Sequence, residues 1–252
     1  MIDVAELVAQ GRAVLVLSAA CCGGRSEQGR VGRVGWVAMG VLSEFESKQL
    51  LASHGVVVSR DKLAESADEA VAALEEIGGP VAVKLCSRSL AHKSERGLVR
   101  LGLDNPEEVR SAAGGLLAAA TEDDGDVALL VSEMVTGHRE LIAGVVHTDQ
   151  FGAALMLGLG GVLAEAVGEA VFRLIPVSAA DCQDMIDDLG MAALLGPLRG
   201  EPAVDRIALT EALLGLAEAA GREGVEAIDV NPLVVREGLP VAVDALVIMS
   251  DT

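Results

Sequence analysis

Three polar side chains interrupt a strand-like segment near the end of the sequence. Residues 228–245 read IDVNPLVVREGLPVAVDA, and Asp229, Asn231 and Asp244 stand there among branched apolar residues. If the central EG pair forms a two-residue hairpin turn, Asn231 faces Asp244 and Asp229 lies on the same face. Amide and carboxylate oxygens suit a hard cation such as Mg²⁺, which shares its shell with waters and phosphates. The pattern predicts a metal site, with a solvated polar face of an edge hairpin as the alternative.

The opposite face of this predicted hairpin is apolar and is expected to face the core. Its members are Ile228, Val230, Val234, Val241, Val243, Ala245 and Val247. Pro232 cannot donate a hydrogen bond to a neighbouring strand, so we expect the pairing to bulge there.

A basic cluster elsewhere could bind the anion that accompanies such a metal. Residues 84–100 read KLCSRSLAHKSERGLVR and contain His92. Lys84 interrupts the apolar strand pattern VAVKLC, where a lysine is costly unless it meets an anion. The alternative is a solvated loop beside a lysine that extends from a sheet edge. The hairpin and the basic cluster together predict a Mg-nucleotide site, to which GLGG at 158–161 could bring backbone amides.

The elements around these residues alternate between helices and antiparallel strands. Ser43 with Glu46 forms a capping box at the start of one predicted helix, and Ser66 with Glu69 repeats it in a second. Strands are predicted at VAVKLC, LVRLGL and DVALLVSEMV, and HRELIAGVVHTDQFGAALML is predicted to form two strands around a turn. Consecutive hairpins mixed with helices favour an α+β fold.

Composition excludes several classes of protein. The chain has 252 residues and a formal net charge of −19, so nucleic acid and anionic membranes are poor partners. No apolar run is long enough to span a membrane. The four cysteines fit neither a disulfide framework nor a zinc site. We therefore expect a cytoplasmic protein with reduced thiols and without membrane or nucleic-acid partners.

The Gly- and Arg-rich stretch GGRSEQGRVGRVGWVAMG separates the first residues from the regular pattern. Composition of this kind is typical of an arm or linker, so residues 1–42 are predicted to be a flexible N-terminal extension. The rest of the chain is expected to divide into subdomains at 43–135 and 136–252.

Six sequence blocks in a fixed order resemble one known family. They are GGPVAVKL…LAHKSERGLV, VSEMVTGHRE, FGAALMLGLGG, FRLIPV, LRGEPAVD and IDVNPLVV…VAVDA. They resemble the ATP-grasp nucleotide-binding subunit of ADP-forming acyl-CoA synthetases (acetate–CoA ligases), relatives of the succinyl-CoA synthetase β-subunit. The resemblance implies an ATP-grasp fold in which two α+β subdomains hold MgATP between them. It also implies the reaction acyl-CoA + ADP + phosphate ⇌ carboxylic acid + CoA + ATP, through an acyl phosphate and a phosphohistidine.

The resemblance also implies roles for individual residues. His92 in the HKS block would accept phosphate, and Asn231 and Asp244 would hold Mg²⁺. The residues that it implies around ATP or ADP are Lys84 at the α- and β-phosphates, Glu133 and Val135 at the adenine and hinge, and Glu140 near the nucleotide.

The sequence departs from the family pattern around the histidine. HKSERGLV stands where the family has HKSDVGGV, so Arg96 replaces Val and Leu98 replaces a Gly. No segment resembles the CoA-binding and ligase domains, so a CoA-binding α-type partner subunit is expected to bind CoA and the small carboxylic acid. Two alternatives remain: a non-catalytic ATP-binding regulatory module, and another ATP-grasp carboxylate ligase.

Overall fold

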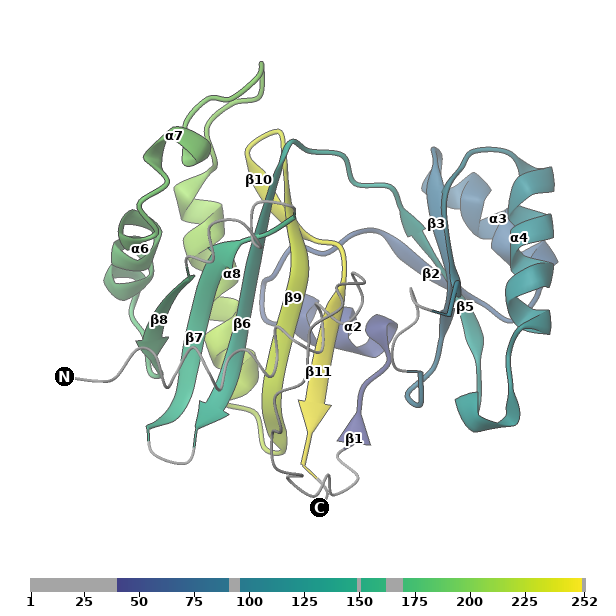
Figure 1. The fold of residues 1–252 in the computed structure, drawn as a ribbon, viewed down its shortest axis with the longest axis horizontal. Coiled ribbons are helices and arrows are strands. Elements are labelled where there is room, and N and C mark those ends of the chain that lie inside the picture. Colours follow the sequence, from purple (N-terminus) through teal and green to yellow (C-terminus); the bar gives the residue numbers. More distant parts are fainter. Residues whose placement is uncertain (1–39, 91–95, 149–150, 162–169, 251–252) are drawn as a thin grey trace, which may run out of the picture.

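The computed structural model describes residues 40–90, 96–148, 151–161 and 170–250. These residues form two antiparallel sheets that stand side by side, each with its own helices (Figure 1). The mixture of helices and antiparallel strands confirms the predicted α+β fold. Within the described part of the chain, no helix combines the length and apolar character that a membrane crossing requires.

The larger sheet has seven strands in the order β1-β11-β9-β6-β7-β8, with β10 paired to β9. All of its pairings are antiparallel. The strands are β1 (Gly40–Val41), β6 (Arg139–Thr148), β7 (Gly152–Leu159), β8 (Ala170–Leu174), β9 (Val225–Arg236), β10 (Leu239–Ala242) and β11 (Ala245–Met249). The helices that accompany it are α2 (Glu44–Ser53), α6 (Ala179–Asp188), α7 (Ala192–Leu195) and α8 (Arg206–Ala220).

The smaller sheet has four antiparallel strands in the order β2-β5-β3-β4. They are β2 (Asp61–Ala64), β3 (Val81–Cys86), β4 (Val99–Leu103) and β5 (Ala128–Glu133). Helices α3 (Ala67–Ile77) and α4 (Pro106–Ala118) cover the face that is turned away from the larger sheet (Figure 1). A 3-10 turn, Glu122–Asp124, leads from α4 into β5.

Each sheet has a separate hydrophobic core. The core of the smaller sheet lies under α3 and α4 and includes Val83, Leu85 and Val131. The core of the larger sheet includes Leu141, Leu157 and residues of α6 and α8. The face of the smaller sheet without helices is thus directed toward the larger sheet, where the side chains of both bodies can meet.

Local sequence signals fix where the helices begin. The Ser43 side chain accepts a hydrogen bond from the Glu46 amide, and the Glu46 carboxylate accepts one from the Ser43 amide, so the predicted capping box is confirmed. The Ser66 side chain accepts from the Glu69 amide, but the Glu69 carboxylate accepts from the Glu65 amide instead of the Ser66 amide, so the second predicted capping box forms only in part. Such caps satisfy amides that a first helical turn leaves without partners.

Helix α2 packs against the larger sheet, although along the chain it comes directly before the first strand of the smaller sheet. Its residues Leu50 and Leu51 belong to the larger core, and β1, just before it, pairs with β11. From Gly40 on, the chain therefore runs from the larger body to the smaller sheet and returns to the larger body at β6. The predicted division of the sequence into 43–135 and 136–252 does not follow this path at its N-terminal end.

The hairpin register predicted near the C-terminus is confirmed. Leu239 pairs with Arg236, and the same register continues to Ala245, which pairs with Val230. Both residues of the EG turn have positive φ, as a two-residue turn of type I′ requires. Asn231 and Asp244 therefore lie opposite each other.

The predicted alternation of faces is wrong in the half of the hairpin near the turn. Val230 packs in the larger core, but beyond it Leu233 and Val235 take the core positions. Val234, which was expected in the core with its partner Val241, lines a surface hollow instead. Just before Pro232, even-numbered residues of β9 thus face the core, and after Pro232 odd-numbered residues face it.

The change of face has a local cause in the backbone. Pro232 offers only its carbonyl, which accepts from the Val243 amide at 3.1 Å. The regular pairing of β9 stops here, between β10 and β11. On the other side of β9, the register with β6 shifts between Leu141 and Ala143. The hairpin register is the same before and after the proline, so the bulge expected in that pairing does not occur. The irregularity lies instead between β9 and β6, where β9 carries one residue more than its partner, and the side-chain alternation of β9 changes at this point.

Candidate functional site

The two predicted metal ligands meet where the C-terminal hairpin changes face. The backbone amide of Asn231 donates a hydrogen bond to the backbone carbonyl of Asp244 at 3.2 Å. The Asp244 side chain is 45% exposed, and it extends toward the smaller sheet, where its carboxylate lies 3.6 Å from the Lys84 ammonium. Both residues are thus placed at the seam between the two bodies.

Asp229 adds a second carboxylate to this region. It is only 7% exposed, and among the described residues its Oδ1 atom has no hydrogen-bond partner. Burial, and then the negative charge of Asp244, raise the pKa of its carboxyl to about 7. A buried carboxylate that is repelled by another carboxylate is stabilised by a cation between them. Asp229 was seen on this face in the sequence but was not predicted as a ligand.

These side chains fit a hard divalent cation. All the donors are oxygens, two of them from carboxylates and one from an amide, as Mg²⁺ prefers. The described residues contain no group of three or more His, Cys, Asp or Glu side chains placed to hold a metal. The hairpin therefore suits a cation that completes its shell with water and phosphate better than one enclosed by protein ligands.

Lys84 points from β3 into the seam. Its side chain is 8% exposed, and its Nζ atom lies 2.6 Å from Glu44 Oε1. Burial by itself lowers the pKa of this ammonium, but the carboxylates of Asp244 and Glu44 outweigh burial and hold the pKa above its ordinary value. The expectation that this strand lysine meets an anion is met here by carboxylates of the other body.

Two residues of α2 take part in this cluster and were missed in the sequence. Glu44 forms ion pairs with Lys84 and with Lys48, and Lys48 also pairs with Asp61 at 2.8 Å. All four side chains are almost completely buried. The i, i+4 spacing of Glu44 and Lys48 is the signal in the sequence that could have indicated their pairing.

The carboxylate of Glu133 lies between two arginines. It accepts hydrogen bonds from the Arg60 amide at 3.1 Å, from Arg60 Nε at 2.9 Å and from the Arg236 guanidinium at 3.2 Å. Burial opposes ionisation, but these bonds and charges lower the pKa of Glu133 below its usual value. Since Arg236 belongs to β9, Glu133 links the end of the smaller sheet to the larger body.

A surface hollow lies directly after Glu133 along the chain. It is lined by Val135, Thr136, Gly137, His138, Glu140, Glu201 and Val234. Two residues predicted to surround a nucleotide, Val135 and Glu140, are therefore brought together. Gly137 is required here, because a Cβ atom at this position would lie 2.2 Å from the Val235 carbonyl.

Glu201 reaches the hollow from a distant segment that the sequence did not connect with it. Its carboxylate accepts from the His138 amide at 3.1 Å and pairs with Arg139 at 3.2 Å. Arg139 is buried and also donates to the Gly196 and Pro202 carbonyls. This arginine therefore fixes the loop before α8 against the hollow.

The glycine loop after β7 packs over Glu140. The Gly160 amide donates to the Glu140 carbonyl at 2.8 Å. Gly161 has φ +64°, and a Cβ atom there would lie 2.8 Å from a Glu140 carboxylate oxygen. Small residues in this loop therefore allow close approach to the predicted nucleotide residue.

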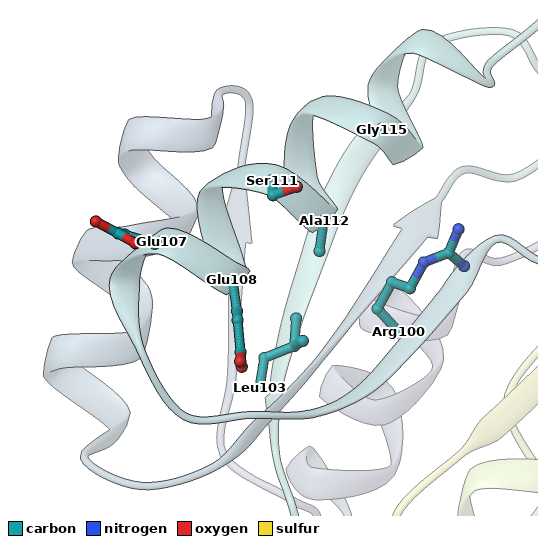
Figure 2. Close-up of a pocket in the computed structure, with 7 residues that line it drawn as sticks. All are labelled: Arg100, Leu103, Glu107, Glu108, Ser111, Ala112 and Gly115. Carbon is teal, nitrogen blue, oxygen red and sulfur yellow. The ribbon is translucent and has the colours of Figure 1, made fainter.

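The basic cluster of the sequence is dispersed in space. Arg96 forms a salt bridge with Asp124. Arg100 pairs in register with Val83, so it faces α4 on the opposite side of the sheet from Lys84. Figure 2 shows Arg100 at the hollow between β4 and α4, which it lines with residues of that helix. The prediction of a shared basic phosphate site is therefore wrong for Arg96 and Arg100.

His92 lies outside the described residues. Two residues after His92 that differ from the family pattern, Arg96 and Leu98, lie within the described part of the chain. Leu98, which stands where the resembling family has glycine, is buried in the smaller core. The glycine before it, Gly97, has the positive φ. Leu98 therefore packs without adopting the backbone conformation that would require glycine, and Arg96 is neutralised by Asp124.

Comparisons with known proteins give the family. The family described as ATP-grasp domain matches residues 38–249. The β subunit of the ADP-forming acetate–CoA ligase II of Pyrococcus furiosus is 36% identical over 213 residues, which cover 82% of this chain and 90% of that protein.

Solved structures agree with this match. An acetyl-coenzyme A synthetase of Ca. Korarchaeum cryptofilum, 32% identical, matches over 94% of this chain and 98% of that chain in two complexes. The complex with coenzyme A and Ca-AMPCP gives a TM-score of 0.76. The complex with coenzyme A and Mg-AMPPCP gives 0.69, and its phosphohistidine segment points towards its nucleotide binding site. The chain belongs to the ATP-grasp family and, within it, to the family of the β subunits of ADP-forming acetate–CoA ligases.

Proposed function

We propose that this chain is the nucleotide-binding subunit of an ADP-forming acyl-CoA ligase, which converts acyl-CoA, ADP and phosphate to a carboxylic acid, CoA and ATP. The observation that carries the proposal is the meeting of Lys84, Asn231, Asp229 and Asp244 at the seam between two sheets. The Lys84 ammonium comes from one sheet and suits the phosphates of a nucleotide. The oxygen ligands come from the other sheet and suit the metal that accompanies those phosphates.

Asn231 and Asp244 would hold Mg²⁺, with Asp229 behind them. When bound, this ion neutralises and bridges phosphate oxygens. Lys84 would contact the α- and β-phosphates, for which its ammonium must turn from Asp244 toward the phosphate. Glu133 and Val135 would frame the adenine and hinge, and the hollow that Val135 and Val234 line would receive the base. The link from Glu133 to Arg60 and Arg236 supports a hinge role for its carboxylate.

His92 would carry the phosphoryl group. In the direction of ATP use, a ring nitrogen of the neutral imidazole attacks the γ-phosphorus, the nitrogen–phosphorus bond forms, and the bond to the ADP oxygen breaks. The unstrained packing of Leu98 supports retention of a working loop despite its departures from the family pattern.

A partner subunit would complete the enzyme. The curated relative is a β subunit, which supports assembly with a CoA-binding, α-type ligase subunit that receives CoA and the small carboxylic acid. We place this assembly in the cytoplasm. The chain by itself is therefore expected to bind MgATP but to form no acyl-CoA from acetate and CoA.

Calorimetric titration of MgATP into the full chain tests the proposal. Asn231→Ala and Asp244→Ala are each expected to weaken binding by about tenfold or more, because each removes a ligand of the metal. Asp184→Ala, which changes an exposed carboxylate on α6, serves as the matched control and is expected to bind like the parent. Binding that ignores both hairpin substitutions would leave the hairpin as a polar edge and refute the metal site.

Two other functions share the nucleotide site and differ in His92. Acid-labile phosphate on the parent chain after incubation with MgATP, absent from His92→Asn, is expected of the ligase. MgATP binding without such phosphate would indicate a regulatory module. ADP release that depends on an added amine would indicate another ATP-grasp carboxylate ligase.

A further inference from the structure

A buried chain of charges leads from α2 to the lysine at the seam. Glu44 Oε1 lies 2.6 Å from Lys84 Nζ and 3.1 Å from Lys48 Nζ. Lys48 Nζ also lies 2.8 Å from Asp61 Oδ2 and 3.1 Å from Ser59 Oγ. The Glu44 side chain is 1% exposed, so this carboxylate interacts with two lysines in surroundings that exclude water.

The larger body holds these charges in place. Lys48 donates to the Val243 carbonyl at 2.8 Å, in the residue next to Asp244. The amide of Val247 donates to the Ser47 hydroxyl at 3.1 Å, which ties α2 to β11. Glu44 occupies the first turn of α2, directly after the Ser43 cap. Its position is therefore set by the segment of the C-terminal hairpin that includes Asp244.

Lys84 comes from the other body and could occupy several positions. A lysine ammonium sits on a flexible four-carbon stem, so strand β3 fixes where the side chain starts but not where it ends. Two carboxylates attract it: Glu44 at 2.6 Å and Asp244 at 3.6 Å. The ammonium therefore lies closer to Glu44 than to Asp244.

We propose that Glu44, anchored by Lys48, is a positioning residue that holds the Lys84 ammonium at the seam. Glu44 itself would touch neither nucleotide nor metal. This inference rests on the proposed nucleotide site and adds a requirement to it. Contact between Lys84 and the phosphates depends on a carboxylate from a helix of the opposite body.

The test compares ligands with and without phosphates. Calorimetry on the full chain, in the presence of Mg²⁺, measures the affinities of ATP and of adenosine for the parent, Glu44→Gln, Lys84→Met and the double variant. Glu44→Gln is expected to weaken ATP by about tenfold and adenosine by less than about twofold. In the Lys84→Met background the same change should alter ATP affinity by less than about twofold, because Glu44 acts only through the lysine.

Two further variants separate positioning from folding. Glu46→Gln perturbs the same first turn of α2 and its pair with Arg88, and is expected to leave the ratio of ATP to adenosine affinity unchanged. Glu44→Asp keeps the charge, so it should retain part of the lost affinity. If Glu44→Gln does not fold, Glu44→Asp replaces it in the cycle with Lys84→Met.

The outcomes distinguish this inference from the proposed function. Equal losses of ATP and adenosine, or an unchanged effect of the Glu44 substitution in the Lys84→Met background, would overturn the positioning role while nucleotide binding stands. No binding of ATP by the parent chain would overturn the proposed site and this inference with it.

Discussion

At the scale of single residues, the seam is defined by charges that are costly to bury and are therefore paired. Lys84, Lys48, Glu44 and Asp61 neutralise one another in a buried cluster. Asp229 differs, because the charge that acts on its carboxylate is that of another carboxylate, Asp244. Such a carboxylate destabilises the folded protein without a metal and stabilises it when a cation is bound beside it.

Asp229→Asn should separate these two effects. The substitution removes one of two neighbouring negative charges, so in EDTA the variant is expected to be more stable to unfolding than the parent by about 1 to 3 kcal/mol. Added Mg²⁺ is expected to stabilise the parent more than the variant. Urea unfolding with and without Mg²⁺ measures both, and Asp184→Asn is the control. A variant that is less stable in EDTA would show that the Asp229 carboxylate is stabilising without a cation.

At the scale of elements, the hairpin of β9 with β10 and β11 decides which side chains face the proposed nucleotide site. Because alternation shifts at Pro232, Leu233 is in the larger core and Val234 lines the hollow. The irregular pairing of β9 with β6 thus exchanges the roles of two adjacent apolar residues that a strict period of two would assign the other way round.

Paired alanine substitutions test this exchange. Leu233→Ala is expected to lower the free energy of unfolding by about 2 to 5 kcal/mol, because it leaves a cavity in the core. Val234→Ala is expected to cost less than half as much and to change affinity for adenosine, because it enlarges the hollow. Denaturant unfolding and calorimetry give the two quantities. If Val234→Ala destabilised the protein more than Leu233→Ala, the strict alternation of faces expected from the sequence would be correct instead.

The first turn of α2 is also an electrostatic element. The Arg88 side chain, together with the cap of Ser43, lowers the pKa of Glu46 from its ordinary value to about 2. A carboxyl whose folded pKa is depressed stabilises the protein above its unfolded pKa, and this stability is lost as pH falls toward the folded pKa.

Glu46→Gln should therefore have a pH-dependent effect. At pH 7 the variant is expected to be less stable by about 0.5 to 1 kcal/mol, a small value because Arg88 and Glu46 are partly exposed and screened by water. The difference between parent and variant should shrink as pH falls from about 5 toward 2. Thermal unfolding over this range measures it. A difference that is constant with pH would mean that the ion pair contributes nothing.

At the scale of the whole molecule, two bodies with separate cores are linked by a few charged contacts. Lys84 with Glu44 and Asp244 forms one link, and Glu133 with Arg236 forms another. A ligand that contacts both walls adds a link, so it should couple the opening motions of the two sheets.

Hydrogen exchange should show this coupling. Excess MgATP is expected to slow exchange in β3 of the smaller sheet and in β9 and β11 of the larger one. In Lys84→Met the protection of β3 should be largely lost and that of β9 retained, because only the phosphate contact from the smaller sheet is removed. Protection confined to one sheet in the parent would contradict a site between the two bodies.

Much of this architecture could be predicted from the sequence because it depends on neighbours along the chain. Helix caps at Ser43 and Ser66, the turn of the C-terminal hairpin and its register are local, and all of them are confirmed. The facing of Asn231 and Asp244 follows from that register alone. The facing of the two residues that we propose as metal ligands could therefore be predicted from the sequence.

The tertiary structure decided everything that depends on contacts between distant segments. Only the fold brings Glu44 of the first helix to Lys84 and Asp244, attaches α2 to the larger body, and sends Arg96 and Arg100 away from the seam. A sequence pattern gives the face of one element but not which element covers it. That depends on how the two sheets pack, and the packing free energy is distributed over residues far apart in the chain.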